Sequence, residues 1–535
     1  MNFDYIIIGA GSAGCVLANR LSENPDHSVL LLEAGGRDIS PMIHIPAGWA
    51  ANFNNPKVDW GYNTEPEPHL KNRQIYWPRG KVLGGSSSIN GMIYIRGVPY
   101  DYDQWAQKGN SGWSWSEVLP YFRRSEDQQH GETTLHGKGG RLRVEDVRMD
   151  MPLQQAFVDA AVEAGLPRNN DFNGETQEGA GYYQFTQKNG RRWSTSVGYL
   201  NDIKKRKNLR IVTGALTSRI HLEDKVARQI TYKRGDKEET VTANREILLC
   251  GGAVNSPQLL ELSGIGSPEI LARAGIEVRH ALPGVGENLQ DHLYSKFVYM
   301  CTLPATINMD VQGIRLIPTV LKYLFFRRGP LTFGSAPVGA FAYTRNDIEA
   351  PDIQIHFASG ATNFQPGKKG IEAMKFHAMT GVVNQSRPES RGHIHIRSAN
   401  PGEHPEILAN YLDHETDRET LVKGMRLLQQ IFESPSLDAY RGNRLMPGEH
   451  VVTDSDLLDY IREDATTVFH PVGTCKMGSD TMAVVNDKLQ VQGLRNLRIV
   501  DASIMPTLVS GNTNAAVIMV AEKAADMILG KTSQI

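Results

Sequence analysis

The sequence predicts a mixed fold, in which an α/β part with a parallel sheet is combined with an α+β part built on an antiparallel sheet with helices. Residues 3–33 read as a strand, a glycine turn, a helix and a second strand, which is the order of a βαβ unit. Strands of alternating polarity appear much later, at residues 353–357 and 392–397, with little sign of crossover helices between them. The length of 535 residues is too great for one small core and predicts two to four domains.

The first element is an apolar strand over residues 3–8, and the sequence GAGSAG follows at residues 9–14. In such a G-x-G-x-x-G turn, Gly9 permits the tight bend, Gly11 lets the backbone approach a pyrophosphate, and Gly14 lets helix and strand pack closely. The free N–H groups of the following helix point at the phosphates. A second apolar run ends at Glu33, about 20 residues on, where a carboxylate accepts ribose hydroxyls. The pattern predicts a dinucleotide site.

The sequence signals for the remaining helices and strands are weaker. Helical spacing predicts helices over residues 152–164 and 515–528, and a short strand is expected at residues 209–212.

Hydrophobic residues make up 40% of the chain, charged residues 22%, and the net charge is −2, so no global field would recruit nucleic acid. The four cysteines are far apart, which argues against a disulfide framework or a zinc site. The first strand begins almost at Met1, without a signal peptide, and we expect a cytoplasmic protein.

One apolar segment, residues 316–326, lies outside the dinucleotide strands and is followed by Arg327 and Arg328. No run of 18 apolar residues exists, so this segment is too short to span a bilayer. Two interpretations stay open. The segment is a buried helix or a dimer face, or it lies on the surface of the inner membrane with its basic end at the headgroups.

Further runs identify a family. They read WPRGKVLGGSSSINGM at residues 77–92, GAVNSPQLLELSGIG at 252–266, HPVGTCKMG at 470–478, VDASIMP at 500–506 and GNTN at 511–514. In this order they resemble the glucose–methanol–choline (GMC) oxidoreductases, which carry FAD, and the resemblance extends from residue 3 to residue 526. It implies a Rossmann-like FAD-binding domain made of residues 1–155, 196–308 and 465–535. A substrate domain of residues 156–195 and 309–464 is interleaved with it.

The resemblance also implies the cofactor contacts and their kind. Family members with covalent FAD have a histidine just before the asparagine at position 90, and this chain has Ile89 there. FAD is therefore expected to be held non-covalently. The expected FAD-binding residues are Gly9, Gly11, Ser12, Ala13, Gly14, Glu33, Ala34, Val82, Gly85, Ser86, Asn90, Gly91, Met92, Ile93, Leu216, Asp501 and Ala502.

His470 is the expected catalytic base, because a neutral imidazole can take a hydroxyl proton near neutral pH. The family match selects it among sixteen histidines. Asn514 is the second expected catalytic residue, donating a hydrogen bond to the substrate oxygen, and its alternative role is a helix N-cap. His292 is interpreted as structural. A metal site from His470 and Cys475 would lack further ligands, and no metal is expected.

The resemblance implies oxidation of a primary alcohol to the aldehyde, with hydride transfer to the flavin N5 and His470 as base. Bacterial alcohol, polyethylene glycol and choline dehydrogenases look most similar. Many choline-oxidising members have a glutamate where this chain reads SAPVGAF at residues 335–341, which favours an uncharged aliphatic or polyether alcohol. The alternatives are a choline dehydrogenase, an oxygen-using alcohol oxidase, a flavin-containing lyase, or a flavin-binding protein without turnover. The electron acceptor would be a quinone, a cytochrome or oxygen.

Overall fold

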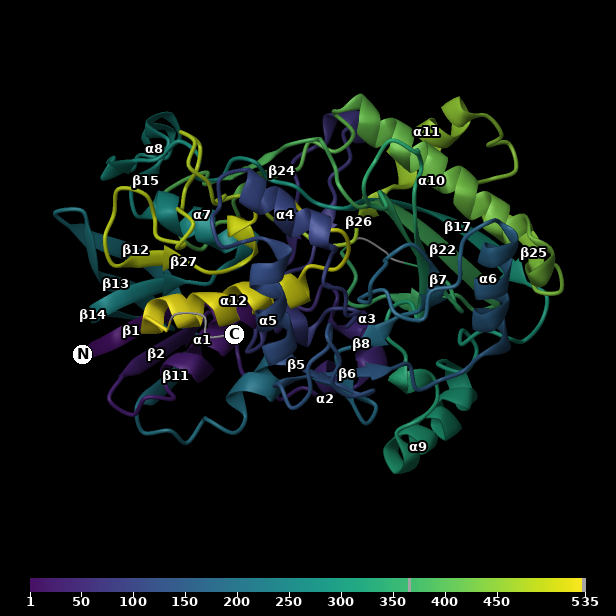
Figure 1. Ribbon diagram of the computed structural model, residues 1–535, viewed down its shortest axis with the longest axis horizontal. Helices are drawn as coiled ribbons and strands as arrows, with labels where there is room; N and C mark the ends of the chain where they lie inside the picture. Colours follow the sequence, from purple (N-terminus) through teal and green to yellow (C-terminus); the bar gives the residue numbers. More distant parts are fainter. Residues whose placement is uncertain (364–366, 532–535) are drawn as a thin grey trace.

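Two large sheets organise the chain, one toward each end of an elongated molecule (Figure 1). The computed structural model describes residues 1–363 and 367–531. The first sheet contains the N-terminal strand, and the second lies beneath the long helix α10 (Glu415–Glu433). The mixture of a parallel-centred sheet and an antiparallel sheet confirms the predicted fold class.

The first sheet has the order β11-β2-β1-β14-β13-β12, with β27 beside β14. Its strands are β1 (Asn2–Ile8), β2 (Val29–Glu33), β11 (Leu209–Thr213), β12 (Leu216–Glu223), β13 (Val226–Arg234), β14 (Lys237–Leu249) and β27 (Leu497–Ile499). β11, β2, β1, β14 and β27 pair in parallel, whereas β12, β13 and the first half of β14 form an antiparallel extension. The carboxyl ends of β1, β2 and β14 therefore meet at one edge, which is where ligands bind in such sheets.

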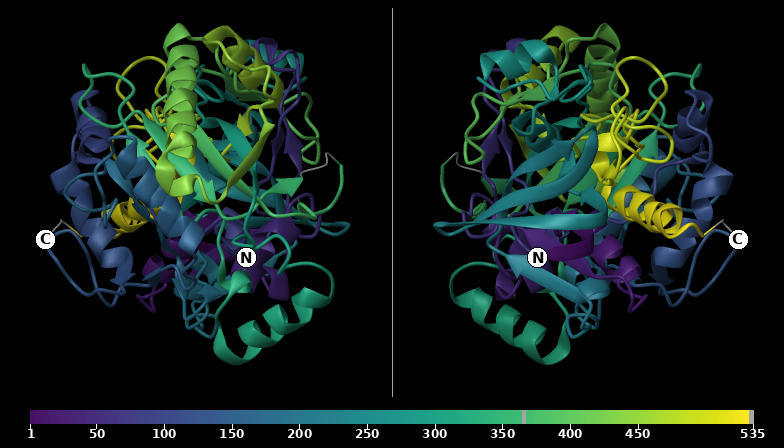
Figure 2. Two further views of the ribbon diagram at one scale, coloured as in Figure 1. Left: turned by 90° about the vertical axis from the view of Figure 1, so that its right-hand side faces the viewer. Right: turned by 90° about the vertical axis from the view of Figure 1, so that its left-hand side faces the viewer.

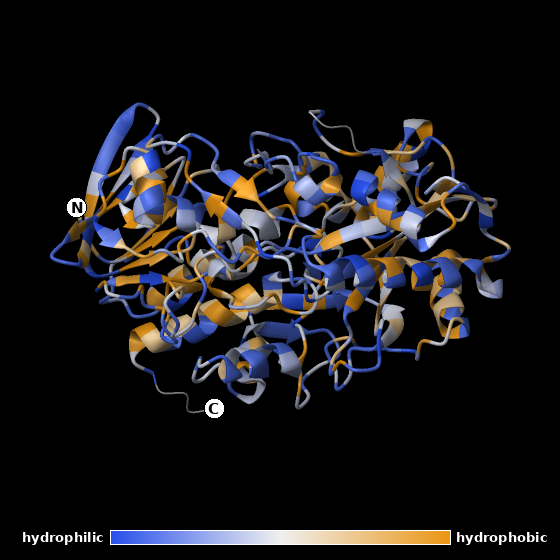
Figure 3. Cartoon of the chain, turned by 90° about the horizontal axis from the view of Figure 1, so that it is seen from above, coloured by the Kyte–Doolittle hydropathy of each residue, from blue (hydrophilic) through white to orange (hydrophobic). Residues whose placement is uncertain are grey.

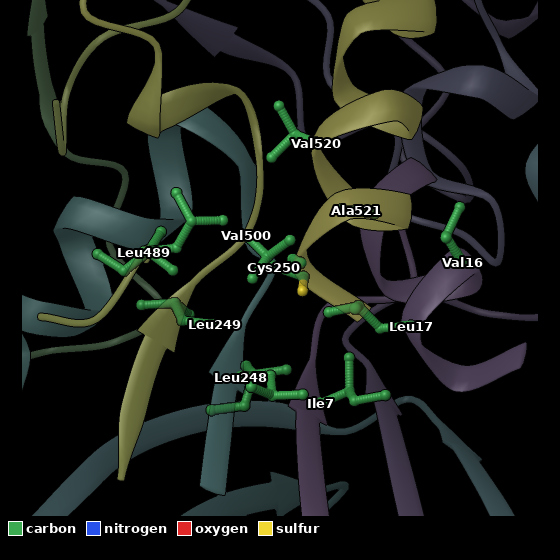
Figure 4. Close-up of a cluster of buried hydrophobic side chains, with 14 of the residues drawn as sticks. Ile7, Val16, Leu17, Leu248, Leu249, Cys250, Leu489, Val500, Val520 and Ala521 are labelled. Carbon is green, nitrogen blue, oxygen red and sulfur yellow. The ribbon is translucent and has the colours of Figure 1, made fainter. Parts of the chain in front are cut away.

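Helices α1 (Ser12–Leu21) and α12 (Asn514–Leu529) pack against each other on this sheet. Figure 4 shows Val16 and Leu17 of α1 and Val520 of α12 among the apolar side chains of the strands. Figure 3 shows the inner strands near the N-terminus as hydrophobic and the outer hairpin as hydrophilic. Helix α12 thus shares one core with the first βαβ unit.

The second sheet is antiparallel, in the order β25-β17-β22-β19-β18-β7, and β26 (Thr466–Thr467) pairs with β17. The strands are β7 (Gly179–Tyr182), β17 (Leu293–Cys301), β18 (Val338–Ala342), β19 (Ile353–Ala358), β22 (Ala378–Gln385) and β25 (Arg441–Met446). Helices α10 and α6 (Pro152–Glu163) pack on this sheet, and the left view of Figure 2 shows α10 crossing it.

The two sheets divide the chain differently from the predicted segments at three places. Strand β17 belongs to the second sheet, although residues up to 308 were assigned to the FAD domain. Strand β26 also pairs there, although it follows residue 464. Helix α6 begins before residue 156 and packs as a whole on the second sheet and α10. Neither β17 nor β26 alternates clearly in sequence, so hydropathy patterns do not reveal where the chain changes sheet.

The other helices connect and cover the sheets. They are α2 (Pro41–His44), α3 (Trp49–Asn52), α4 (Pro99–Gln107), α5 (Trp115–Ser125), α7 (Gly252–Leu262), α8 (Pro268–Arg273), α9 (Leu316–Phe326) and α11 (Asp454–Asp464). Short strands form ribbons of their own, among them β20 (Thr362–Asn363) with β21 (Glu372–Ala373). The strand expected at residues 392–397 is β23 (His393–His395), which pairs with β24 (Glu406–Leu408) and not with a large sheet.

Helix α9 stands out from the body of the molecule in Figures 1 and 2. Only Thr319 and Tyr323 of this helix are buried, so a buried helix is wrong for this segment, whereas the dimer face and the membrane surface stay open. Among the described residues, no helix is both long and apolar enough to cross a membrane.

Candidate active site

A cavity of about 820 Å³ extends from the glycine turn after β1 to His470. Residues of both sheets line it, including Ile8 and Leu249 of the first and Tyr294 and His356 of the second. Its volume lies within the usual range for cofactor and small-molecule sites. The cavity is therefore the candidate active site.

Glycines shape the end of the cavity that adjoins α1. A side chain at Gly9 would place its Cβ 2.5 Å from the carbonyl oxygen of Cys250, and one at Gly14 would lie 1.9 Å from the oxygen of Gly9. A Cβ on Gly85 would lie 2.7 Å from the Cα of Gly11, so the two glycine runs touch at the N-terminus of α1. The first N–H groups of that helix have no acceptor within the helix. Close backbone, free N–H groups and an anion-favouring helix end fit the pyrophosphate of FAD.

The glycines that meet at the N-terminus of α1 (Gly9, Gly11, Gly14 and Gly85) form what we call the cofactor cradle. Two buried carboxylates connect this cradle to the rest of the chain. Glu33 accepts from the backbone N–H groups of Ala10, at 2.9 Å, and Gly35, at 2.8 Å. Burial raises the pKa of Glu33 to about 7. Asp501 accepts from the Gly252 N–H and the Ser256 hydroxyl, which ties the middle and C-terminal motifs together.

The structure brings most of the expected cofactor residues together. The cavity wall includes Gly9, Gly11, Ser12, Ala13, Glu33, Ala34, Gly85, Ser86, Asn90, Gly91, Met92, Ile93, Leu216, Asp501 and Ala502. Gly14 and Val82 are not part of it. Gly14 lies behind the turn, and Val82 packs in a small core with Ile43, Val58 and Ile89. These two residues shape the cradle from behind.

His470 sits on the loop after β26, and a buried carboxylate fixes its backbone. The N–H of His470 donates to Asp291 Oδ1 at 2.7 Å, and Asp291 also accepts from the hydroxyls of Tyr411 and Thr467. The preceding residue, Phe469, has φ of +69°, which is strained for an aromatic residue. Such strain persists where the surrounding structure holds it, and it is common at active sites.

A chain of hydrogen bonds determines which nitrogen of His470 can accept a proton. His292 Nε2 lies 2.9 Å from the carbonyl oxygen of Ser386, which can only accept, so His292 Nε2 carries the hydrogen. The other nitrogen of neutral His292, Nδ1, is then an acceptor, and His470 Nδ1 lies 3.0 Å from it. His470 Nδ1 therefore donates, and the lone pair of neutral His470 is on Nε2. The residue is oriented as a base toward the cavity.

Burial keeps these imidazoles neutral. It lowers the pKa of His470 well below the usual range, and the nearby His292, His356 and Arg79 lower it further. Burial also lowers the pKa of His292 to about 4 and that of His356 to about 3. Desolvation disfavours the charged form of each ring. At neutral pH His470 is therefore unprotonated, the form in which a base can take a proton.

The amide nearest to His470 belongs to Asn512, not to Asn514. Asn512 Nδ2 lies 3.2 Å from His470 Nε2, and its Oδ1 accepts from Gln354 Nε2 at 3.3 Å. Asn514 begins α12, and its Oδ1 accepts from the Ser12 hydroxyl at 2.6 Å, beside the glycine turn. The structure therefore does not bring Asn514 to the base. Asn514 was expected from the sequence, whereas the structure places Asn512 beside His470. The GNTN run at residues 511–514 contains both asparagines, so the run alone does not show which of them faces the base.

Family models described as GMC oxidoreductase match residues 3–294 and 388–521. The chain is a GMC oxidoreductase. As expected for this family, it is an FAD-dependent enzyme, and its glycine cradle fits that cofactor. Among the described residues, no group of histidine, cysteine and acidic side chains could hold a metal ion.

Named relatives of this GMC oxidoreductase include two dehydrogenases. It is 44% identical over 535 residues to the oxygen-dependent choline dehydrogenase of Photobacterium profundum, covering 99% of this chain and 93% of that one. It is 44% identical over 536 residues to an alcohol dehydrogenase (acceptor) of Pseudomonas putida, covering 99% and 96%. The crystal structure of pyridoxine 4-oxidase from Mesorbium loti aligns with a TM-score of 0.87 at 33% identity, over 98% of both chains. A formate oxidase variant from Aspergillus oryzae aligns with a TM-score of 0.90 at 27% identity, over 99% of this chain and 98% of that one.

Sequence reasoning missed three residues of the GMC oxidoreductase site. His292 was interpreted as structural, yet it sets the tautomer of His470. Asn512 and Gln354 were not proposed, although Gln354 belongs to an alternating strand that was predicted. The available signal was the pairing of two polar positions, Gln354 and His356, on one face of an apolar strand.

Proposed function

We propose that this enzyme oxidises an uncharged primary alcohol, aliphatic or polyether, to the aldehyde and passes the electrons to a separate acceptor. The proposal rests on one observation. Asn512 Nδ2 donates a hydrogen bond to the lone pair of His470 Nε2 over 3.2 Å, and both residues lie on the wall of the cavity that also holds the cofactor cradle. A proton acceptor and a neutral hydrogen-bond donor at one point suit a reacting hydroxyl.

The reaction removes a proton from the hydroxyl and a hydride from its carbon. Bound FAD supplies the hydride acceptor. His470 Nε2 takes the hydroxyl proton, and Asn512 Nδ2 donates to the substrate oxygen as negative charge develops there. The protonated His470 keeps its Nδ1 hydrogen bond to His292, which stabilises the positive ring. Asp291 holds the backbone in place throughout.

The preference for an uncharged substrate follows from the charges of the cavity wall. The carboxylates that line the described cavity are Glu33, Asp464 and Asp501. Glu33 and Asp501 are occupied by backbone and hydroxyl donors, and Asp464 forms an ion pair with Lys296 at 3.0 Å. A quaternary ammonium would therefore lose hydration without gaining an unpaired negative partner.

The wall beside the base is instead apolar and aromatic. Phe53 and Phe469 pack edge to face with their ring centroids 5.5 Å apart, and Trp49 packs on Phe53 at 5.7 Å. All three line the cavity. Such a wall favours the carbon chain of an alcohol, and an aromatic cage for a cation would supply only about 0.5–2 kcal/mol.

The substrate test compares kcat/KM for choline, a medium-chain primary alcohol and a short polyethylene glycol, with a soluble dye as acceptor. We expect the uncharged alcohols to exceed choline by at least about tenfold, which corresponds to about 1.4 kcal/mol. A tenfold advantage for choline would contradict the proposal. The same assay with oxygen in place of the dye distinguishes a dehydrogenase from an oxidase, and anaerobic bleaching of the flavin by alcohol distinguishes both from a lyase.

We also propose that FAD is bound non-covalently. Ile89, at the position that carries a histidine in covalent members, is packed with Val82 and Ile43 and offers no nucleophile. Acid precipitation of the purified protein should release all of its flavin into the supernatant. Flavin retained in the washed pellet would contradict this assignment.

A further inference from the structure

In helix α9 two polar residues face the protein and most of the apolar residues face the solvent, which is the opposite of a normal surface helix. Thr319 and Tyr323, four residues apart, face the body of the protein and are buried. Six apolar side chains of the helix are exposed: Leu316 at 36%, Ile317 at 59%, Leu321 at 49%, Leu324 at 55%, Phe325 at 75% and Phe326 at 70%. Ile314, just before the helix, is 83% exposed. Water-facing helices place such residues toward the core, and a patch of this kind marks an interaction site.

The surroundings of this apolar face are basic. Arg315 precedes the helix, Lys322 lies within it, and Arg327 and Arg328 follow it. Residues 311–346 contain no aspartate or glutamate. None of these four cations forms an ion pair within the described part of the chain. The helix therefore presents apolar side chains and uncompensated positive charge together.

We propose that α9 docks on a lipid bilayer with anionic headgroups, lying in the interface with its apolar side chains among the acyl chains. The combination of protruding aromatic and aliphatic residues with flanking Arg and Lys suits that partner. The apolar side chains supply buried area among the acyl chains, and the basic side chains supply attraction to the anionic headgroups. A second copy of α9 fits less well, since two copies would bring together like charges without carboxylates to balance them.

The docking helix is fastened to the wall of the catalytic cavity. Gln312 Nε2, just before α9, donates to the carbonyl oxygen of Met374 at 2.8 Å. Asn308 Nδ2 donates to the oxygens of Ala361, at 2.7 Å, and Met374, at 3.2 Å. Met374 and the neighbouring Ile371 line the cavity. Docking through α9 would hold this side of the cavity near the lipid, where apolar alcohols and a lipid-soluble quinone are concentrated.

The test is cosedimentation of the purified holoenzyme with vesicles of phosphatidylcholine alone or mixed with phosphatidylglycerol. We expect binding to the mixed vesicles that weakens with salt, and weaker binding to pure phosphatidylcholine. The triple variant Leu321→Ser/Phe325→Ser/Phe326→Ser should bind mixed vesicles at least tenfold less. The variant Arg315→Glu/Arg328→Glu should lose the preference for the anionic lipid.

A matched control replaces exposed apolar residues far from α9 in sequence. Val278 and Val452 are 41% and 64% exposed, and Val278→Ser/Val452→Ser should bind like the parent. Thermal unfolding and flavin content establish that each variant is folded, and dye-linked turnover reports the proposed function independently. Absence of vesicle binding by the parent, or equal binding by the triple variant, would overturn the proposal. So would a dimer in solution that the triple substitution dissociates while the parent ignores vesicles.

Discussion

The two ends of the cavity are built in different ways. The cradle comes from contiguous glycine motifs whose backbones touch, as Gly85 and Gly11 do. The catalytic end comes from His292, His470 and Asn512, which lie on separate loops and meet only through folding. Burial acts on both ends in the same direction, toward the neutral form. It raises the pKa of Glu33 to about 7 and lowers that of His470.

The difference shows what a motif can convey. Glycine spacing encodes backbone geometry directly, because the absence of Cβ is itself the structural feature. A catalytic side chain needs the correct residue, rotamer and partner, and these are set by distant residues. Substitutions at the catalytic end should therefore lower turnover while leaving cofactor content intact. Substitutions in the cradle should lower cofactor content while leaving turnover per bound flavin intact.

The largest effect should come from His470→Ala. Losing a general base lowers turnover with alcohols by roughly 10²–10⁴. Flavin content, measured by absorbance against protein concentration, should stay near that of the parent, because the ring is directed at the substrate position. Turnover within threefold of the parent would remove His470 from the mechanism.

The two asparagines provide a matched pair. Asn512→Ala should lower kcat by roughly 10²–10³, the cost of removing one donor to a developing oxyanion. Asn514→Ala should instead weaken retention of FAD, since its amide oxygen holds Ser12 beside the glycine turn. Steady-state kinetics at saturating FAD separate the two effects. A larger loss of kcat for Asn514→Ala than for Asn512→Ala would show that Asn514, as the sequence indicated, is the catalytic asparagine.

At the cradle, Gly85→Ala should weaken binding of the cofactor. The added Cβ would lie 2.7 Å from the Cα of Gly11, and φ at Gly85 is +52°, so both space and backbone oppose it. Overpacking of this kind costs about 1–3 kcal/mol, which predicts roughly tenfold to hundredfold weaker FAD binding. Gly36→Ala, where no atom lies within 4 Å of the new Cβ, is the control. Equal flavin affinity of the two variants would contradict the tight cradle.

Much of the fold could be predicted from the sequence, and the reasons are local. The strand and helix of the first βαβ unit, α6 and α12 follow from periodicity and glycine placement. The domain boundary at β17 could not be predicted, because its pairing with β22 is a long-range choice between two sheets. The contact of His292 with the base could not be predicted for a similar reason. Its chemistry comes from Ser386 and His470, neither of which is near it in sequence.

A smaller effect is expected from His292→Phe, which keeps a ring but removes the acceptor for His470 Nδ1. Loss of one hydrogen bond of about 1–2 kcal/mol should lower kcat roughly tenfold. The positioning role has a second signature. With Nδ1 unpaired, either tautomer of His470 becomes accessible, and the effect on kcat should exceed that on KM. A variant that only loses thermal stability, with kcat unchanged, would show that His292 is merely part of the core.

The smallest effect concerns pH. Because the base is neutral, activity should change little with pH near neutrality. Only unprotonated His470 accepts a proton, and its pKa is held well below 6.5 by burial and by the nearby His292, His356 and Arg79. Activity is therefore fully present above that lowered pKa and is lost only as pH falls through it. With a non-ionising alcohol, kcat/KM for the free enzyme should stay constant from pH 8 to pH 6 and decline at lower pH. Samples held at low pH and assayed again at pH 7.5 exclude irreversible unfolding. A midpoint of the kcat/KM profile at or above pH 6.5 would mean that His470 is hydrated. It would contradict the conclusion that burial lowers the pKa of the base.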